Sequence, residues 1–486
     1  MKSNPETKKI DKKIDFPTHH FCFTQKTQGT GIRGVISQSL ANFIVKYFEY
    51  DINDIIEKIE IEDFSITTSL IDVDFSEISI GIKNFSSEHV NFIFNSPKYI
   101  NINIFNLEGW GKFKCDYKNK LMSGKSSAVF DMSNLNITSS IIIKTKKEKS
   151  ERLIVDAELF KFNVKYEYDF ILCGDYETMF SMLKPIIKQN INNAIDNAIK
   201  FQANRCLNYC LSLIPNDIQL DIIKGTKIDF SLINDPIIEN NFIIFNSYSH
   251  YFSNHIKEAK NKNNYFLTLG IPSYNLIGKP QQVLISEYVV NFALFTFYKL
   301  NDLKYKLTPE IMPQNIPLIK LNTGWLGIFF KDFGVKYGME KEVEISFKIN
   351  KEPQVSINKK GLSFILPTLI NVDVRNVDLS VVVLNTNFYV NASLIVVDDY
   401  ITGKIDNIEV GYTNIIYSYS DFENFGSTFE KNLNNIRGIC VPFLNNFIKL
   451  NMQYPIPKID NVKICDISIE YYEQFISINF DVDFNK

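Results

Sequence analysis

The sequence predicts an α+β protein with two similar domains, each an antiparallel sheet curled around one long amphipathic helix. Two observations predict this fold class. Long segments alternate apolar with charged or amide residues, as between Phe160 and Phe170, which is typical of a sheet with one buried face. The order helix, strands, long helix also occurs twice, at a period of about 220–240 residues. Because such a helix and such a sheet each need a partner, we expect the sheet to close around the helix.

The composition is that of a globular chain with long elements. The 486 residues are 45% hydrophobic and 22% charged, which excludes intrinsic disorder over most of the chain and indicates about two to four domains. A net charge of −3 gives no reason to expect nucleic acid as a partner. Phe (40) and Tyr (24) both outnumber Gly (20) and Pro (16), so turn residues are scarce. The longest apolar segment, Tyr288–Tyr298, is too short for a transmembrane segment, which needs about 18 residues.

The first half opens with a polar tail over residues 1–30, followed by a helical pattern from Gln38 with Ser37 placed to cap its first turn. Strands follow, and one of them turns Ile100, Ile102 and Ile104 to the same face. A long helix is predicted from about Tyr176 to Leu213, because apolar residues recur at three- and four-residue steps. The first apolar stripe is Leu40, Ile44, Phe48, Ile52, Ile55 and Ile59, and that of the long helix is Phe180, Leu183, Ile187, Ile191, Ala194, Ala198 and Phe201.

The second half repeats this order. We predict a helical stretch near Val283–Tyr298, strands between about Glu342 and Ser420, and a second long helix. The stripe of that helix is Phe425, Phe429, Leu433, Ile436, Ile439, Phe443 and Phe447, and the closing strand alternates Ile476, Ile478, Phe480, Val482 and Phe484. The predicted domains are a flexible tail (1–30), a first domain (31–225), a central sheet and linker (226–280), and a second domain (281–486) whose last strands join the central sheet.

Motifs that carry chemistry are weak in this chain. Gly29, Gly31 and Gly34 spell G-x-G-x-x-G, but a polar tail precedes them and a strand-like segment follows, whereas the dinucleotide motif joins a strand to a helix. His250 and His255 lie in a Tyr- and Asn-rich segment that we predict to be a loop, where histidines are commonly exposed. No G-x-S-x-G elbow occurs. We therefore expect no enzyme activity, catalytic residue, metal site or cofactor.

The two helix-and-sheet units allow two interpretations. If helix and sheet leave a gap, the gap is a tunnel lined by Phe, Ile and Leu, and such a tunnel suits an acyl chain. Burying each methylene would contribute about 0.8 kcal/mol. If side chains fill the space instead, the same stripes form an ordinary hydrophobic core. The patterns alone leave both interpretations open.

Five segments together resemble the family of bactericidal/permeability-increasing protein and lipopolysaccharide-binding protein. The family's opening, its Lys-rich hairpin, its entry into the second domain, the end of its last helix and its closing strand are similar, in that order, to GTGIRGVISQSL, GWGKFKCDYKNKLMSGKSSAVFDM, LISEYVVNFALFTFY, RGICVPFLNNFIKLNMQYPIP and ISINFDVDF. These segments run from Gly29 to Phe484, so the resemblance covers nearly the whole chain and depends on their order and spacing.

The resemblance implies a boomerang of two tubular lipid-binding domains joined by a central antiparallel sheet, each tube holding a phospholipid. Members of the family bind lipopolysaccharide or carry phospholipids and cholesteryl esters between membranes and lipoproteins. We therefore expect a monomeric lipid-binding protein that transfers phospholipid; the alternatives are a secreted defence protein that binds lipopolysaccharide, and an interaction protein with filled tubes. The expected lipid contacts are Leu40, Ile44 and Phe48 with Leu183, Ile187 and Ile191 in the first tube, and Phe429, Leu433 and Ile436 in the second.

Secretion and one disulfide are further features of the family. We expect extracellular localisation by resemblance, but no signal peptide is visible, so an intracellular location stays open. The family's disulfide joins a strand of the first tube to the long helix. Cys206 lies near the helix position, whereas Asp156 stands where the strand cysteine is expected. Cys173 is the nearest substitute, which predicts a bond from Cys173 to Cys206 or Cys210.

The Lys-rich hairpin also has two interpretations. Its lysines interleave with Trp110 and Phe113, and in the family cationic loops at the tip of the first tube meet anionic headgroups. Near an anionic membrane each lysine contributes on the order of 1 kcal/mol. The alternative is a solvated hairpin, the usual place of a charge run. The lysines predicted to contact an anionic membrane or lipopolysaccharide are Lys112, Lys114, Lys118 and Lys120, and a second cluster is Lys144, Lys146, Lys147 and Lys149.

Overall fold

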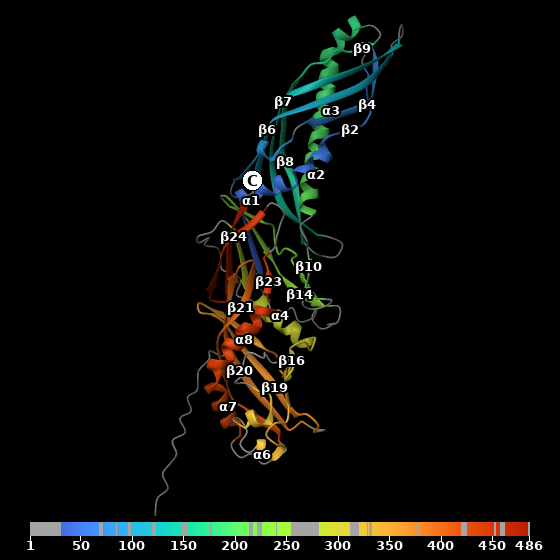
Figure 1. The fold of residues 1–486 in the computed structure, drawn as a ribbon. Coiled ribbons are helices and arrows are strands. Elements are labelled where there is room, and N and C mark those ends of the chain that lie inside the picture. The colour runs from blue at the N-terminus through green and yellow to red at the C-terminus, as the bar shows by residue number, and fades with distance from the viewer. Residues whose placement is uncertain are drawn as a thin grey trace, which may run out of the picture.

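Two tubular domains lie on either side of a central sheet, in an elongated molecule that bends near its middle (Figure 1). The structure is a computed structural model. It describes residues 31–67, 71–83, 85–95, 99–118, 123–147, 153–174, 177–212, 217–220, 226–239, 241–253, 281–311, 320–327, 329, 333–377, 380–418, 425–451, 453–456 and 462–484. The chain contains both helices and antiparallel sheets, two of which are curled, and this confirms the predicted α+β fold class.

The first half begins with β1 (Ile32–Ser37), α1 (Gln38–Tyr47) and α2 (Glu49–Ile56). The first tube then adds β2 (Ile59–Ile61), β3 (Phe64–Thr67), β4 (Asp72–Lys83), the 3-10 turn η1 (Ser87–His89), β5 (Val90–Asn95), β6 (Tyr99–Lys118), β7 (Ser123–Lys147), β8 (Leu153–Tyr168), β9 (Cys173–Gly174) and α3 (Glu177–Ser212). The middle of the chain forms β10 (Asp217–Leu220), β11 (Thr226–Asp229), β12 (Ile237–Glu239), β13 (Phe242–Ser247) and β14 (His250–Ser253).

The second half begins with β15 (Gln281–Ser286) and α4 (Glu287–Lys299). The second tube contains β16 (Lys304–Leu307), α5 (Thr323–Leu326), α6 (Phe333–Tyr337), β17 (Val343–Ile349), β18 (Gln354–Asn358), β19 (Gly361–Val374), β20 (Val382–Val397), β21 (Tyr400–Val410), β22 (Asn414–Ser418), α7 (Phe425–Asn435), α8 (Arg437–Asn451) and β23 (Gln453–Pro455). The chain returns to the centre through β24 (Val462–Tyr472) and β25 (Phe475–Phe484).

The first tube is a curled sheet in the order β2-β4-β6-β7-β8, with α3 packed against the edge strand β8. The 36 residues of α3 confirm the predicted long helix. Ser37 caps α1 as predicted, since its side chain accepts the N–H of Leu40 at 3.4 Å. The helical pattern from Gln38 does not continue to Ile59, because the chain turns at Phe48 and Ile59 lies in β2.

The second tube has the strand order β16-β17-β19-β20-β21-β23, and its long helix is divided. The prediction of a single helix there is wrong in one detail. The structure has two helices, of which α7 ends at Asn435 and α8 begins at Arg437. Asn434, Asn435 and Gly438 around the break have low helix propensity, which explains its position. The helical stretch predicted near Val283–Tyr298 begins at Glu287, because Val283 belongs to the central strand β15.

One residue of the predicted alternation in β8 faces the wrong way. Phe162, Val164, Tyr166 and Tyr168 point inward, but Phe160 is 58% exposed. The pairing of β7 with β8 shifts there, from Ser140–Lys161 to Ile141–Leu159, so Phe160 is an unpaired bulge residue. A bulge moves the following side chains to the opposite face, which the strict period of two did not anticipate.

The central sheet has approximate twofold symmetry, in the order β12-β13-β1-β15-β25-β24. β1 and β15 pair at its centre, each leads into a helix after a serine, and each has a hairpin on its outer side. The predicted segment 226–280 supplies only β12 and β13 of these six strands, so the sheet draws on more of the chain than that segment.

Hydrogen bonds repeat across the same axis. The N–H of Gln38 at the start of α1 donates to the carbonyl of Asn241 at 2.9 Å, and the N–H of Glu287 at the start of α4 donates to that of Gln474 at 2.7 Å. Asn241 and Gln474 both occupy the left-handed region, with φ of 72° and 73°. The two halves therefore share one design in which a hairpin turn receives the first helical N–H.

Gly31 holds the two halves together at this axis. Its N–H donates to the carbonyl of Ser247 at 2.8 Å, and its own carbonyl accepts the N–H of Ser286 at 2.9 Å. A Cβ at Gly31 would lie 2.1 Å from the carbonyl oxygen of Tyr248, whereas a Cβ at Gly34 would meet nothing within 4 Å. The backbone approach thus requires glycine at one position and not at the other.

We predict that Gly31→Ala lowers the free energy of unfolding by about 1–3 kcal/mol, because backbone atoms must move to admit the methyl group. Gly34→Ala, on the same strand, is the control and should change it by less than about 0.5 kcal/mol. Urea unfolding followed by circular dichroism measures both variants. Equal midpoints for the two variants would contradict the close approach at Gly31.

Candidate lipid-binding site

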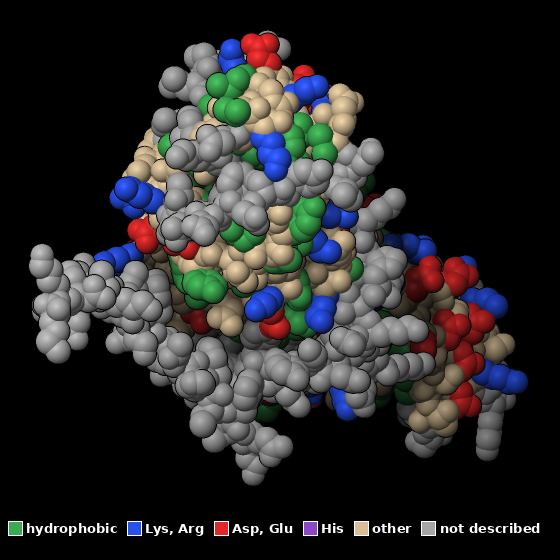
Figure 2. All heavy atoms as spheres, turned by 90° about the horizontal axis from the view of Figure 1, so that it is seen from below, with side chains coloured by type: hydrophobic (Ala, Val, Ile, Leu, Met, Phe, Trp, Pro, Cys, Tyr) green, Lys and Arg blue, Asp and Glu red, His purple; other side chains and the backbone are tan. Residues whose placement is uncertain are grey.

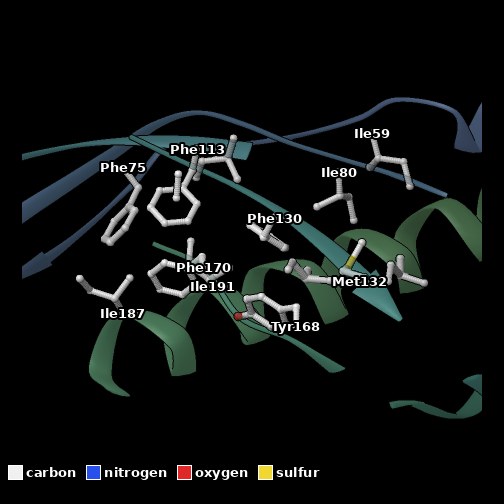
Figure 3. Close-up of a cluster of buried hydrophobic side chains, with 14 of the residues drawn as sticks. Ile59, Phe75, Ile80, Phe113, Phe130, Met132, Tyr168, Phe170, Ile187 and Ile191 are labelled. Atoms are coloured by element: carbon white, nitrogen blue, oxygen red, sulfur yellow. The ribbon is translucent and has the colours of Figure 1, made fainter. Parts of the chain in front are cut away.

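The end of the first tube far from the central sheet is filled by aromatic side chains. Phe113 lies at the centre, with ring centroids 5.7 Å from Phe75 and 5.4 Å from Phe170, and Phe130 stacks near Tyr168 at 4.6 Å (Figure 3). These rings belong to the buried cluster of the tube. In this distal half the filled-core interpretation therefore applies.

The predicted lipid contacts on α3 lie at this filled end. Ile187 and Ile191 are each 1% exposed and belong to the aromatic cluster, and Leu183 packs against it (Figure 3). Further along α3 the buried row continues through Ile195 and Ile199. The sequence pattern instead predicts that the stripe continues through Ala194, Ala198 and Phe201. Ala198 packs against the core, but Phe201 is 67% exposed.

The other predicted contacts occupy the inner sides of their helices to different degrees. Leu40, Ile44 and Phe48 are half-buried, but the core clusters pack on their neighbours Ala41 and Val45. In the second tube Phe429 is buried, with its ring 6.2 Å from that of Phe329. Leu433 and Ile436 pack against the same cluster.

A cleft opens along the seam between α3 and β8, in the half of the first tube nearer the central sheet. Its volume is about 930 Å³, within the range of about 300–1,000 Å³ typical of small-molecule sites. We call it the α3–β8 cleft. It is lined by Lys144, Lys146, Val155, Asp156, Ala157, Glu158, Leu159, Asn197, Lys200, Phe201, Asn204, Asn208 and Leu211.

The α3–β8 cleft is lined by both apolar and charged side chains. The apolar side chains, together called the apolar wall, are Val155, Ala157, Leu159, Phe201 and Leu211, from both β8 and α3. The rim contains lysines and carboxylates of opposite charge in the same opening. Such a lining is amphipathic, as is a lipid at the junction of acyl chain and headgroup.

Polar side chains of α3 replace the missing neighbour of the edge strand β8. Asn208 bridges the walls of the cleft: the N–H of Ala157 donates to its Oδ1 at 3.3 Å, and its Nδ2 donates to the carbonyl of Ala157 at 3.4 Å. Above the cleft, the hydroxyl of Tyr166 donates to Asp196 at 3.1 Å and that of Tyr168 to Asn192 at 2.7 Å. Burial raises the pKa of both tyrosines, so both hydroxyls stay protonated donors at neutral pH. The cleft begins at Asn197, directly beyond this contact.

The second tube uses the same side-chain amide contact twice. Asn434 exchanges two hydrogen bonds with the backbone of Val410 on β21, at 3.0 and 3.3 Å. Asn445 exchanges two with the backbone of Ile405, at 2.6 and 2.8 Å. Helix and edge strand are therefore joined along this seam in the same manner as at Asn208.

Ion pairs and hydrogen bonds shape the mouth of the α3–β8 cleft. Lys144 pairs with Glu158, and their hydrogen bond raises the pKa of the lysine and lowers that of the carboxyl. Asp235 accepts both the N–H and the hydroxyl of Thr145 at 2.7 Å, which fixes the end of β7 against the middle of the chain. The same bonds from Thr145 lower the pKa of Asp235. The end of β7 beside the mouth is therefore fixed to Asp235.

The Lys-rich hairpin is not a simple cationic surface. Lys114 pairs with Glu77 at 2.5 Å and Lys125 with Asp116 at 2.9 Å, both across neighbouring strands. Phe113, expected among the surface residues, is 2% exposed and lies in the core. The lysines at 112 and 118 point outward on β6, and Lys120 lies outside the described residues.

The predicted disulfide between Cys173 and Cys206 is not formed. Cys173 precedes the first residue of α3 and has a free thiol, whereas Cys206 lies in its last two turns. A helix of this length spans about 54 Å at 1.5 Å per residue, which separates the two thiols. Cys210 is in the last turn, and its side chain lies outside the described residues.

Several other features of the sequence receive a structural role. Gly34 lies inside β1, so the glycine motif does not join a strand to a helix. His250 is in β14 rather than in a loop. Gly29 and His255 lie outside the described residues. Among the described residues no group of three or more His, Cys, Asp and Glu side chains is placed to hold a metal ion. None of the described helices is long and apolar enough to cross a membrane.

Sequence reasoning named Phe201, Lys144, Lys146 and Asp156 but missed the other residues of the α3–β8 cleft. The three asparagines and the lysine that α3 contributes gave no apolar signal, and their role depends on where β8 runs. The isoleucines at every fourth position, 187 to 199, are the signal that places Phe201 outside the buried row.

Comparison with known proteins identifies the family. A family model for the C-terminal domain of the LBP / BPI / CETP family matches residues 221–484, more than half of the chain. A bactericidal permeability-increasing protein from Sebastes schlegelii is 20% identical over 372 residues, which cover 74% of this chain and 75% of the relative. A crystal structure of lipopolysaccharide binding protein aligns over 94% of this chain and 100% of its own, with 16% identity and a TM-score of 0.48. The chain belongs to the LBP/BPI/CETP family.

Proposed function

We propose that this protein binds a phospholipid, with an acyl chain on the apolar wall of the α3–β8 cleft, and carries it without catalysing a reaction. The observation that supports this most is an opening of about 930 Å³ beside a tube whose distal half is filled. Membership of the LBP/BPI/CETP family is the second support. The amphipathic lining fits a lipid better than a fully polar or fully apolar ligand.

The geometry suggests how the lipid lies. An acyl chain would contact Val155, Leu159 and Leu211, with the exposed ring of Phe201 covering its outer side. A phosphate would lie at the rim, where Lys146 and Lys200 provide positive charge. Each methylene taken out of water contributes about 0.8 kcal/mol, so the apolar wall supplies most of the affinity. The proposal also includes a monomeric state, extracellular localisation and transfer of the lipid between membranes, and membership of the family supports these parts of it.

The apolar wall can be tested with one charge. Leu159→Asp places a carboxylate on the wall, where its desolvation opposes acyl-chain binding. We expect the amount of lipid that copurifies with the chain to fall at least about fivefold, an effect of roughly 1 kcal/mol. Native mass spectrometry combined with lipid extraction measures it.

Phe160→Asp is the matched control, since Phe160 is the neighbouring bulge residue and is exposed on the other face of β8. Its lipid content should equal that of the unchanged protein. Copurified lipid that is the same in Leu159→Asp and in the unchanged protein would contradict the proposal, as would an unchanged protein without lipid.

In one alternative the first domain binds bacterial lipopolysaccharide through a basic tip, and the name of the relative from Sebastes schlegelii, bactericidal permeability-increasing protein, favours bacteria as the target. The tip lysines would then contact lipid phosphates. The pairing of Lys114 with Glu77 and of Lys125 with Asp116 reduces the charge available for that contact. We therefore rank this function second.

The alternative makes a separate prediction. Changing Lys112, Lys114, Lys118 and Lys120 together to Glu should weaken binding of purified lipopolysaccharide and of anionic vesicles at low salt, because each lysine near anionic phosphate contributes on the order of 1 kcal/mol. Vesicle pelleting and lipopolysaccharide titration measure the change. Unchanged binding in both assays would remove the basic tip as a headgroup site.

A further inference from the structure

The far end of the second tube is closed by a small cap. α5, α6 and the turns around them turn Leu326, Phe329 and Phe333 inward, with 0–4% exposure, onto the cluster of the tube. The N–H of Val343 donates to the carbonyl of Leu321 at 3.0 Å, and the hydroxyl of Thr323 donates to the carbonyl of Gly338. The cap is therefore a fixed part of the domain, attached to the start of β17.

The same cap presents apolar side chains outward. Val335 on α6 is 80% exposed and Met339 in the next turn is 63% exposed. The sulfur of Met339 lies beside Gly334, the residue before Val335, since a Cβ at Gly334 would come within 2.4 Å of it. Ile416 at 58% is on β22, whose last residue Ser418 pairs with Val382 at the same end of the sheet. Three large apolar side chains are thus exposed at this end of the domain.

Three carboxylates at this end form ion pairs with cations of the chain. Arg375, in the turn after β19, pairs with Glu310, Glu342 and Glu344, and Lys306 also pairs with Glu344 at 2.6 Å. Hydrogen bonds from Thr308 and Arg375 lower the pKa of Glu310 to about 2. The acidic side chains of this network thus lie in internal ion pairs, which reduces their repulsion of an anionic surface.

Lysines surround the apolar side chains of the cap. Lys336 follows Val335, and Lys341 lies two residues after Met339, beside Glu340. Figure 2, which views the molecule from below, shows hydrophobic side chains interspersed with Lys and Arg, and with some Asp and Glu, over this end. Apolar side chains dispersed among cations are typical of surfaces that enter the headgroup region of a bilayer, whereas protein interfaces have a contiguous apolar centre.

We propose that the cap of the second domain docks on a phospholipid membrane, with Val335 and Met339 inserted at the level of the headgroups and Lys336 and Lys341 toward the phosphates. This surface lies at the opposite end of the molecule from the Lys-rich hairpin (Figure 1). It gives the protein a membrane contact that is separate from the α3–β8 cleft and independent of what the cleft binds.

The test is partition of the full-length protein onto vesicles of phosphatidylcholine with about one fifth phosphatidylserine, measured by flotation. The double variant Val335→Asp with Met339→Asp should partition about tenfold less than the unchanged protein, because two apolar side chains no longer leave water. The matched control is Ile237→Asp with Tyr454→Asp, since these side chains are 41% and 57% exposed and belong neither to the cap nor to the Lys-rich hairpin. Its partition should stay as in the unchanged protein.

Two further readouts separate this proposal from lipid binding and from misfolding. The double variant should keep the circular dichroism spectrum and the copurified lipid of the unchanged protein. Partition that is equal in the double variant and the unchanged protein would overturn the proposal. A loss as large in the control double variant, or an unchanged protein that does not float with the vesicles, would also overturn it.

Discussion

The constraint on which the tubes depend is the open edge of each curled sheet. The edge strand β8, and β21 beyond the three residues that pair with β23, expose backbone N–H and C=O groups that need partners, and the long helices supply them through side chains. Asn208, Asn434 and Asn445 each exchange two hydrogen bonds with one residue of the edge strand. An amide side chain offers one donor and one acceptor in a plane, so it replaces a neighbouring strand for one residue.

The seam also determines where a ligand can enter. In the second tube Asn434 and Asn445 join helix and strand at two levels, whereas in the first tube the α3–β8 cleft lies between the tyrosine contacts at Asp196 and the end of α3. The distal half of that tube is filled by Phe113 and its neighbours, whereas the α3–β8 cleft, where we propose that the acyl chain lies, opens toward the central sheet. The two tubes share a fold and a symmetric central sheet.

Much of the fold could be predicted from the sequence, because it depends on local periodicity. The length of α3 and the cap at Ser37 are local signals, and the structure agrees with them. The repeat of the two halves is also present, but the equivalent residues Ser37 and Ser286 lie 249 residues apart (286 − 37), more than the predicted 220–240. Phe160 and Phe201 were misplaced because a bulge and the drift of the buried row along α3 depend on neighbouring strands. The pairing of Lys114 with Glu77 joins residues 37 apart in sequence, and the cleft depends on such distant contacts throughout, so composition and spacing could not reveal either.

The most direct measurement of the central claim is a map of where a bound lipid lies. A phospholipid with a photoactivatable group near the end of one acyl chain can be loaded into the full-length protein, cross-linked and located by peptide mass spectrometry. The account predicts adducts on the two walls of the seam, within residues 155–159 of β8 and 197–211 of α3. Adducts confined to the filled end around Ile187 and Ile191, or to the second tube, would contradict it.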